Sequence, residues 1–124
     1  MSQKNNYKNF EFIKTSGDID EFILSKNNLR VLLLEDHAAP VATLMVTYHV
    51  GSRNEAIGYT GSTHLLEHLM FKGSKNYNKE NGTAIWTELQ SIGAQINATT
   101  WNDRTNYFEV VPSEHLEKAI AIES

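Results

Sequence analysis

The chain has 124 residues, 40% of them hydrophobic, which is enough for one small globular domain and excludes a disordered composition. Eleven basic and fifteen acidic residues give a formal net charge of −4, and no basic cluster is long enough to follow a phosphate backbone. Nucleic acid is therefore not expected as a partner. Because there is no cysteine, any metal must be bound by histidine or carboxylate groups.

The N-terminal segment 1–17 is predicted to be a polar extension. Its first nine residues are rich in Lys, Asn and Gln and lack the apolar core of a signal or transit peptide, so we expect a cytoplasmic location. The patch 10–13 either adds a short strand or stays mobile. Purely apolar runs such as 31–34 are too short to span a membrane, and no membrane partner is expected.

The first predicted elements after this segment are strands. Residues 19–25 and 29–34 form a hairpin around a polar turn. Residues 41–50 form a longer strand with apolar side chains on both faces, which predicts a place in the middle of a covered sheet.

Helices and strands then alternate along the rest of the chain. A helix is expected within 60–72, capped by Thr60 or Ser62 and closed by Gly73 at the C′ position. A second helix begins near Asn78 or Asn81 and ends at Ile92, because apolar residues recur there at helical spacing.

The final elements are predicted to be strands at 95–100 and 104–111, joined by a tight turn, and a helix that begins after Ser113. The fold class expected from all these elements is α+β, an antiparallel sheet with helices packed on it.

The segment 60–72 carries the candidate chemistry, with His64, Glu67 and His68 at its centre. Residues four apart on a helix lie on one face about one turn apart, so the two imidazoles are able to bind a single cation. Glu67 is placed to take a proton from water without being a ligand. In isolation this pattern more often marks a solvated polar face of an amphipathic helix.

The same helix is expected to be anchored by its apolar side chains. These would pack into a core, so that the site rests on a buried, stiff support. They are Leu65, Leu66, Leu69 and Met70.

The His-x-x-Glu-His order of this segment resembles the pitrilysin or insulinase family of zinc peptidases, the inverzincins. The resemblance extends, in order and spacing, from about Asp18 onward. It includes Gly51-Ser52-Arg53-Asn54-Glu55, Phe71-Lys72-Gly73-Ser74, Gly93-Ala94, Asn97-Ala98-Thr99 and Thr105-Asn106-Tyr107-Phe108.

The resemblance implies that 18–124 is the N-terminal portion of a pitrilysin-like zinc peptidase domain. His64 and His68 would bind Zn²⁺, together with a Glu about seventy or more residues after the motif. Only 56 residues follow His68, so that third ligand is expected beyond Ser124. Several acidic residues could substitute by residue type only, and none matches the family position: Glu80, Glu88, Glu109, Glu114, Glu117 and Glu123.

The implied activity is that of a zinc metalloendopeptidase with Glu67 as general base, acting on peptides or unfolded polypeptides. Asn97, Ala98 and Thr99 are implied to pair with an extended substrate by main-chain hydrogen bonds. A homologous second half or partner subunit is implied to enclose the substrate, and residues 1–124 alone are expected to be inactive. The alternative is a non-catalytic structural or partner subunit that keeps the family scaffold.

Some of these residues also have plain structural explanations. Trp86 and Tyr107 favour core packing over substrate stacking. Arg53 and Glu55 could form a local salt bridge. The Asn97 amide could simply satisfy backbone groups at a strand edge.

Overall fold

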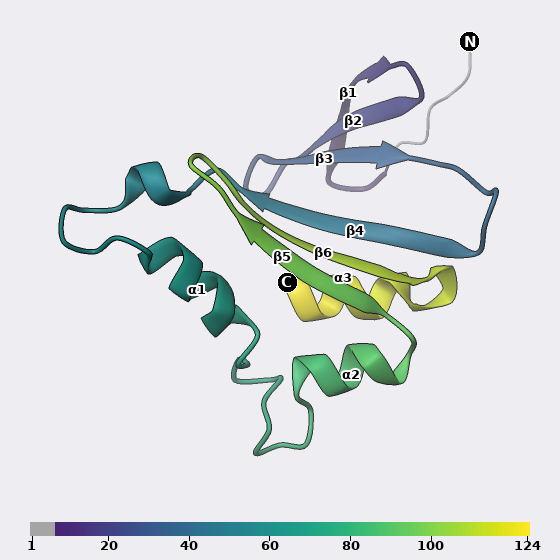
Figure 1. Ribbon diagram of the computed structural model, residues 1–124. Coiled ribbons are helices and arrows are strands. Elements are labelled where there is room, and N and C mark those ends of the chain that lie inside the picture. The colour runs from purple at the N-terminus through teal and green to yellow at the C-terminus, as the bar shows by residue number, and fades with distance from the viewer. Residues whose placement is uncertain (1–6) are drawn as a thin grey trace, which may run out of the picture. The chain divides into compact units, whose positions relative to one another are not determined.

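The computed structural model describes residues 7–124 and divides between Ala39 and Pro40 into two compact units (Figure 1). Six residues of the expected polar extension, 1–6, lie outside the described residues. Within 7–124, no helix has the length and apolar character needed to cross a bilayer.

The first unit is a three-stranded antiparallel sheet in the order β1-β2-β3. Its strands are β1 (Phe10–Ser16), β2 (Ile19–Leu24) and β3 (Leu29–Leu34), so the predicted hairpin is confirmed and the patch at 10–13 belongs to a strand. The turn between β1 and β2 lies at residues 17 and 18, inside this sheet. Phe22 is buried, and the ring of Phe12 packs edge-on against it, with centroids 5.6 Å apart.

The second unit contains a separate antiparallel sheet in the order β4-β6-β5. Its strands are β4 (Val41–Tyr48), β5 (Gln95–Thr100) and β6 (Thr105–Pro112). The prediction that residues 41–50 form a central strand is wrong, because β6 lies between the other two. The second apolar face of β4 is largely exposed instead, with Val41 52% and Met45 54% accessible.

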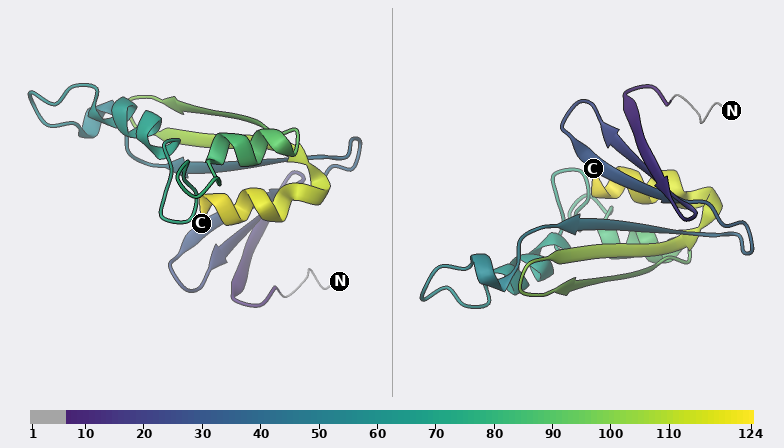
Figure 2. Two further views of the ribbon diagram at one scale, coloured as in Figure 1. Left: turned by 90° about the horizontal axis from the view of Figure 1, so that it is seen from below. Right: turned by 90° about the horizontal axis from the view of Figure 1, so that it is seen from above.

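Three helices lie on one face of this second sheet (Figure 2). They are α1 (Ser62–Met70), α2 (Ile85–Ser91) and α3 (Leu116–Glu123); one-turn 3₁₀ helices, η1 (Ser52–Asn54) and η2 (Ser113–His115), precede α1 and α3. Buried side chains from α2, β5, β6 and α3 form the core between sheet and helices, namely Leu89, Ala98, Tyr107, Val111 and Ala119. The α+β class is confirmed, although its strands form two sheets.

The helix α2 is shorter than predicted, because it begins at Ile85 and not near Asn78 or Asn81. The Asn78 side chain instead hydrogen bonds to the carbonyl of Ser74 at 3.0 Å and accepts the N–H of Asn81 at 2.8 Å. Asn side chains that bond nearby backbone offer the chain an alternative to helix. Periodicity alone does not detect that competition.

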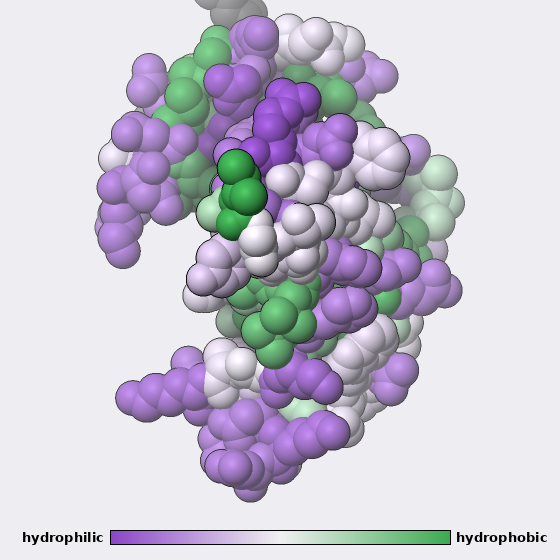
Figure 3. Space-filling model, turned by 60° about the vertical axis from the view of Figure 1, so that its left-hand side comes forward, coloured by the Kyte–Doolittle hydropathy of each residue, from purple (hydrophilic) through white to green (hydrophobic). Residues whose placement is uncertain are grey.

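The apolar side chains of α1 do not pack into a core as predicted. The helix contacts β5 on the side that carries Glu67, which is buried, and this orientation turns the apolar residues outward. They are between 43% and 59% exposed: Leu65, Leu66, Leu69 and Met70. Figure 3, a view of the side on which α1 lies, shows hydrophobic side chains at the surface beside hydrophilic ones. Polar contacts that also hold the helix are described next.

Candidate metal centre

The N-terminus of α1 is capped by Glu55, not by Thr60 or Ser62 as predicted. Gly61, with φ of 90°, is the N-cap residue and has no side chain to cap with. The Glu55 carboxylate accepts the N–H of Gly61 at 2.8 Å and the N–H of Thr63 at 3.0 Å. Hydrogen bonds from the Thr63 hydroxyl first, and then from these amides, lower the pKa of Glu55. An ionised carboxylate at this end also complements the helix dipole.

The other end of α1 also differs from the prediction. The helix ends at Met70 with Phe71 as its C-cap, so Gly73 does not occupy the C′ position. Gly73 has φ of 126°, and a Cβ there would lie 2.4 Å from the carbonyl oxygen of Tyr77. Glycine is therefore needed for the loop that follows the helix.

The segment before α1 is fastened to the turn between β5 and β6. The N–H of Ser52 donates to the carbonyl of Trp101 at 3.0 Å, and the N–H of Arg53 donates to that of Asn102 at 2.9 Å. A Cβ on Gly51 would lie 2.1 Å from the Trp101 oxygen, so only glycine permits this approach. Two segments about fifty residues apart in the sequence are thus brought together.

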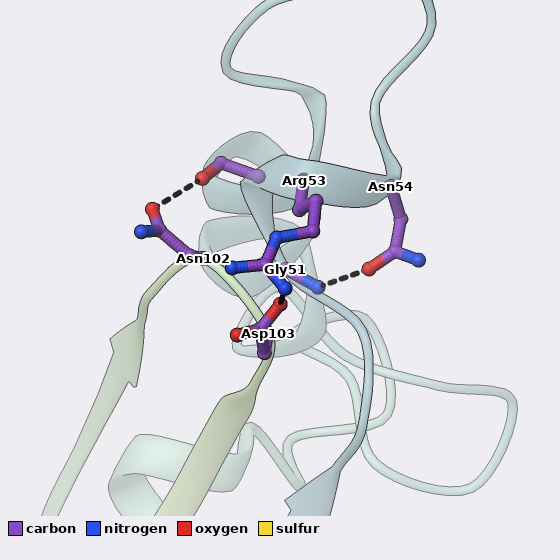
Figure 4. Close-up of polar contacts among 6 residues, drawn as sticks. Gly51, Arg53, Asn54, Asn102 and Asp103 are labelled. Carbon is purple, nitrogen blue, oxygen red and sulfur yellow. Dashed lines mark hydrogen bonds and ion pairs between the residues drawn. The ribbon is translucent and has the colours of Figure 1, made fainter.

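Side chains reinforce the same junction (Figure 4). The Arg53 guanidinium lies 3.0 Å from the Asp103 carboxylate, and the Ser52 hydroxyl donates to Oδ1 of Asn102 at 3.1 Å. Within the segment before α1, Asn54 accepts the N–H of Gly51 at 3.0 Å. Arg53 therefore pairs with Asp103, and the alternative pair with Glu55 does not form, since Glu55 caps α1. The junction fixes where α1 begins relative to the strand β5.

His64 and His68 lie on the same exposed face of α1, as the spacing predicts. Their ring centroids are 4.8 Å apart, and the ring planes are inclined by 34°. Two imidazoles that each bind one zinc ion at about 2.1 Å place their ring centres roughly 5 Å apart. The separation of the two rings is therefore compatible with two ligand positions of one zinc ion.

A third ligand is not found in residues 7–124. No group of three or more His, Cys, Asp or Glu side chains in this part of the chain is arranged to hold a metal ion. The candidates by residue type, such as Glu80 and Glu88, are therefore not assembled with the two histidines. Glu88 instead forms an ion pair with Lys118 at 2.7 Å.

Glu67 points away from solvent, toward the sheet. It is only 8% exposed, and its Oε2 accepts a hydrogen bond from the hydroxyl of Thr100 at the end of β5. Thr100 is the one residue within 7–124 that hydrogen bonds to this carboxylate. The general base predicted from the sequence is thus held by a strand and not by its own helix.

Tyr107 on β6 is buried, as the packing interpretation predicted. Its ring lies 5.9 Å from that of Tyr48 and 6.0 Å from that of Phe71, measured between centroids. Burial first, and then the negative charge of Glu67, raise the pKa of the Tyr107 phenol. Tyr107 therefore stays neutral at physiological pH.

The strand β5 offers an open edge, because it is the outermost strand of the sheet β4-β6-β5. The N–H of Trp101 donates to the carbonyl of Arg104 at 2.8 Å, which makes that pair a hydrogen-bonded one. Bonding alternates along an antiparallel pair, so the backbone groups of Thr99 and Asn97 face β6. Those of Ala98 and Thr100 face the open edge.

Of the three residues expected to pair with substrate, Ala98 thus presents its backbone to the open edge. The Asn97 side chain accepts the N–H of Ala98 at 2.8 Å, which is the strand-edge role considered as its structural explanation. Pairing of a substrate with Ala98 stays a prediction, and it requires the Asn97 amide to move aside.

The comparisons with known proteins show the family. The model of the family described as Insulinase (Peptidase family M16) matches residues 30–123. The chain therefore belongs to the insulinase family of peptidases, and the predicted resemblance is confirmed.

Individual relatives include peptidases and a subunit of a respiratory complex. The chain is 34% identical to the human insulin-degrading enzyme over 76% of its own length and 9% of that protein. It is 38% identical to human mitochondrial cytochrome b-c1 complex subunit 1, over 80% of the chain and 20% of that protein. It is 37% identical to an uncharacterised zinc protease of Rickettsia bellii, over 78% of the chain and 23% of that protein.

A solved structure has the same fold. A protease from Helicobacter pylori superposes with a TM-score of 0.71 at 31% sequence identity, over 91% of this chain and 24% of that one. The chain thus spans less than a quarter of the length of each protein named here.

Two residues that support the site were missed by sequence reasoning. Thr100 was predicted only as the end of a strand, and no sequence signal pairs it with Glu67 across 33 positions. Glu55 was named in the family resemblance and as a possible partner of Arg53, but its role as the cap of α1 was missed, because Thr60 and Ser62 are the residues that the local sequence favours for capping.

Proposed function

We propose that this chain is the motif-bearing N-terminal part of a zinc metalloendopeptidase. The observation that carries the proposal is the arrangement on α1, where the rings of His64 and His68 share one exposed face at 4.8 Å and Glu67, one residue before His68, is buried against β5. Membership of a peptidase family supports it, as does similarity to a protein named as a zinc protease.

In the proposed reaction, His64 and His68 hold two positions of the zinc ion and a residue outside 1–124 supplies a third. When bound, zinc polarises the scissile carbonyl and makes water more acidic. Glu67 accepts the proton of the attacking water and then donates it to the leaving amine, so the chain itself forms no covalent intermediate. Its burial keeps competing solvent from the carboxylate, and Thr100 fixes one of its oxygens.

The proposed substrate is an extended peptide or an unfolded polypeptide that adds a strand to the open edge of β5. Main-chain hydrogen bonds at Ala98 and Thr100 would supply most of the substrate affinity. Such bonds discriminate little between different substrate side chains. The exposed apolar face of α1 would be covered in the longer protein or by a partner subunit.

A second candidate function is that of a non-catalytic subunit. The similarity to a subunit of the cytochrome b-c1 complex favours it. The intact His64, Glu67 and His68 set favours the peptidase. A glutamate at the family's third-ligand position in the longer protein, together with hydrolysis, would decide for the first candidate.

The decisive experiment is hydrolysis of an unstructured polypeptide by the full-length protein with and without a chelator. We expect cleavage that the chelator abolishes and added Zn²⁺ restores, because the carbonyl and the water depend on the metal. The variant His64→Ala/His68→Ala is expected to stay inactive after Zn²⁺ is added. Cleavage that survives both chelation and this double substitution would refute the proposal.

Zinc titration by calorimetry on residues 1–124 tests the metal ligands apart from activity. Two histidines alone bind weakly, so we expect affinity weaker than micromolar, lost altogether in His64→Ala/His68→Ala. His37→Ala, which changes an exposed histidine elsewhere in the chain, is the matched control and should bind like the unchanged chain. Binding that the double variant retains would place the metal elsewhere.

A further inference from the structure

We infer that Thr100 is a positioning residue that holds the Glu67 carboxylate in place for the reaction. The inference rests on the proposed function and deepens it, because it names a residue outside the His-x-x-Glu-His segment on which the general base depends. The contact that carries it is the hydrogen bond from the Thr100 hydroxyl to Glu67 Oε2.

Burial makes this hydrogen bond important for Glu67. Glu67 is 8% exposed as a residue, and its carboxylate has no other hydrogen-bond donor within residues 7–124, so water cannot readily replace Thr100. Without this donor, one oxygen of the buried carboxylate would have no hydrogen-bond partner, which is unfavourable, or the side chain would turn toward solvent. Either change moves the base away from the position that the fold gives it.

The anchor is on a rigid element. Thr100 is the last residue of β5 and pairs in register with Thr105 on β6, whose hydroxyl donates to the Val50 carbonyl at 2.9 Å. The next residue, Trp101, is tied to the segment that precedes α1. The end of β5 and the start of α1 are therefore fixed to each other, and Glu67 is held between them.

Thr100 also joins the base to the open strand edge. Its side chain points to Glu67, whereas its backbone faces the edge where an extended peptide would pair. Substitution of the side chain leaves the backbone in place. Loss of the hydroxyl is therefore expected to affect the chemical step and not substrate binding.

The test compares Thr100→Val, which removes the hydroxyl at nearly constant shape, with Thr100→Ser, which keeps it. In the full-length protein, with kcat expressed per bound zinc, we expect Thr100→Val to lower kcat at least about tenfold with KM within about twofold. Thr100→Ser should recover most of kcat. Thr43→Val, the same chemical change on the exposed face of β4 in the same sheet, is the matched control and should leave kcat unchanged.

Other outcomes would overturn the inference. Unchanged kcat in Thr100→Val would show that the hydroxyl does not position the base, and a rise in KM alone would assign Thr100 to substrate binding. Loss of bound zinc in Thr100→Val would show that Thr100 supports α1 and its two histidines, and not the position of Glu67. The unchanged protein is measured alongside these variants. If it is inactive, the proposed function is contradicted, and the hydrogen bond between Thr100 and Glu67 is then tested by the unfolding experiment below.

The same hydrogen bond can be tested without an activity assay, by measuring the denaturant unfolding of residues 1–124 in the absence of metal. If the contact forms, Thr100→Val combined with Glu67→Ala should lower the denaturation midpoint by less than the sum of the two single substitutions. Strictly additive shifts would overturn the inference even where no variant can be assayed for hydrolysis. Glu67→Ala with Thr43→Val, a pair that makes no contact, is the additive control.

Discussion

Replacement of Glu67 by glutamine in the full-length protein is expected to lower peptide hydrolysis by roughly 10²–10⁴-fold, the usual contribution of general acid–base catalysis. The amide keeps the size of the carboxylate and still accepts a hydrogen bond from Thr100, but it cannot take a proton from water. Because Glu67 is not a predicted ligand, bound zinc should stay at the level of the unchanged protein. Steady-state hydrolysis and metal analysis of the same preparations measure both.

Glu114→Gln is a suitable control for this experiment. Glu114 lies in the 3₁₀ turn before α3 with an exposed side chain, so the same chemical change there should leave hydrolysis unaffected. Activity that persists in Glu67→Gln would exclude Glu67 as the base. Loss of zinc together with activity would make Glu67 a ligand and contradict the role proposed for it.

Sequence reasoning predicted which elements follow residue 18, because hydrophobic periodicity is a local signal, but it misplaced the start of α2 and the caps of α1. The order of strands and helices after residue 18 agrees with the structure, and the spacing of His64 and His68 predicts their shared face. The motif and its flanking segments were sufficient to identify the family.

What the sequence could not show depends on contacts between distant residues. The strand 41–50 reads as central because both faces are apolar, yet position in a sheet is decided by which strands pair, and β6 occupies the middle. Helical periodicity likewise identified the apolar residues of α1 without indicating that Glu67 would be its buried side chain. The link from Thr100 to Glu67 has no local signature.

The pairing of Glu109 with Glu123 is a further result of such distant contacts. Glu109 lies in the middle of β6, between Leu44 and Ile96 on the neighbouring strands, and is 2% exposed. Its Oε2 is buried without a hydrogen-bond partner in residues 7–124. Burial first, and then the hydrogen bond and negative charge of Glu123 on α3, raise the pKa of Glu109 to about 8.

This raised pKa predicts that the second unit becomes less stable as pH rises. In the unfolded chain Glu109 ionises near its ordinary pKa of 4.5, whereas in the folded chain it keeps its proton up to about pH 8. The folded state therefore binds more protons between these values, and the free energy of unfolding falls with rising pH across this window. We expect a loss of about 2 kcal/mol. Full conversion of the pKa shift, at about 1.4 kcal/mol per pKa unit, would give a larger loss. The expected loss is smaller because relaxation of the protein and penetration of water reduce the cost of a buried charge.

Glu109→Gln should remove this pH dependence, because the amide stays neutral and still donates a hydrogen bond to Glu123. We expect the variant to match the unchanged chain near pH 4.5 and to exceed it by about 2 kcal/mol at pH 8.5. Denaturant unfolding of residues 1–124 at both pH values measures the difference, and the histidines contribute equally to both proteins. Glu114→Gln should follow the unchanged chain throughout. Parallel pH profiles for Glu109→Gln and the unchanged chain would show that Glu109 is already ionised at neutral pH. The contact between β6 and α3 would then contain a charged Glu109 carboxylate and not a protonated one.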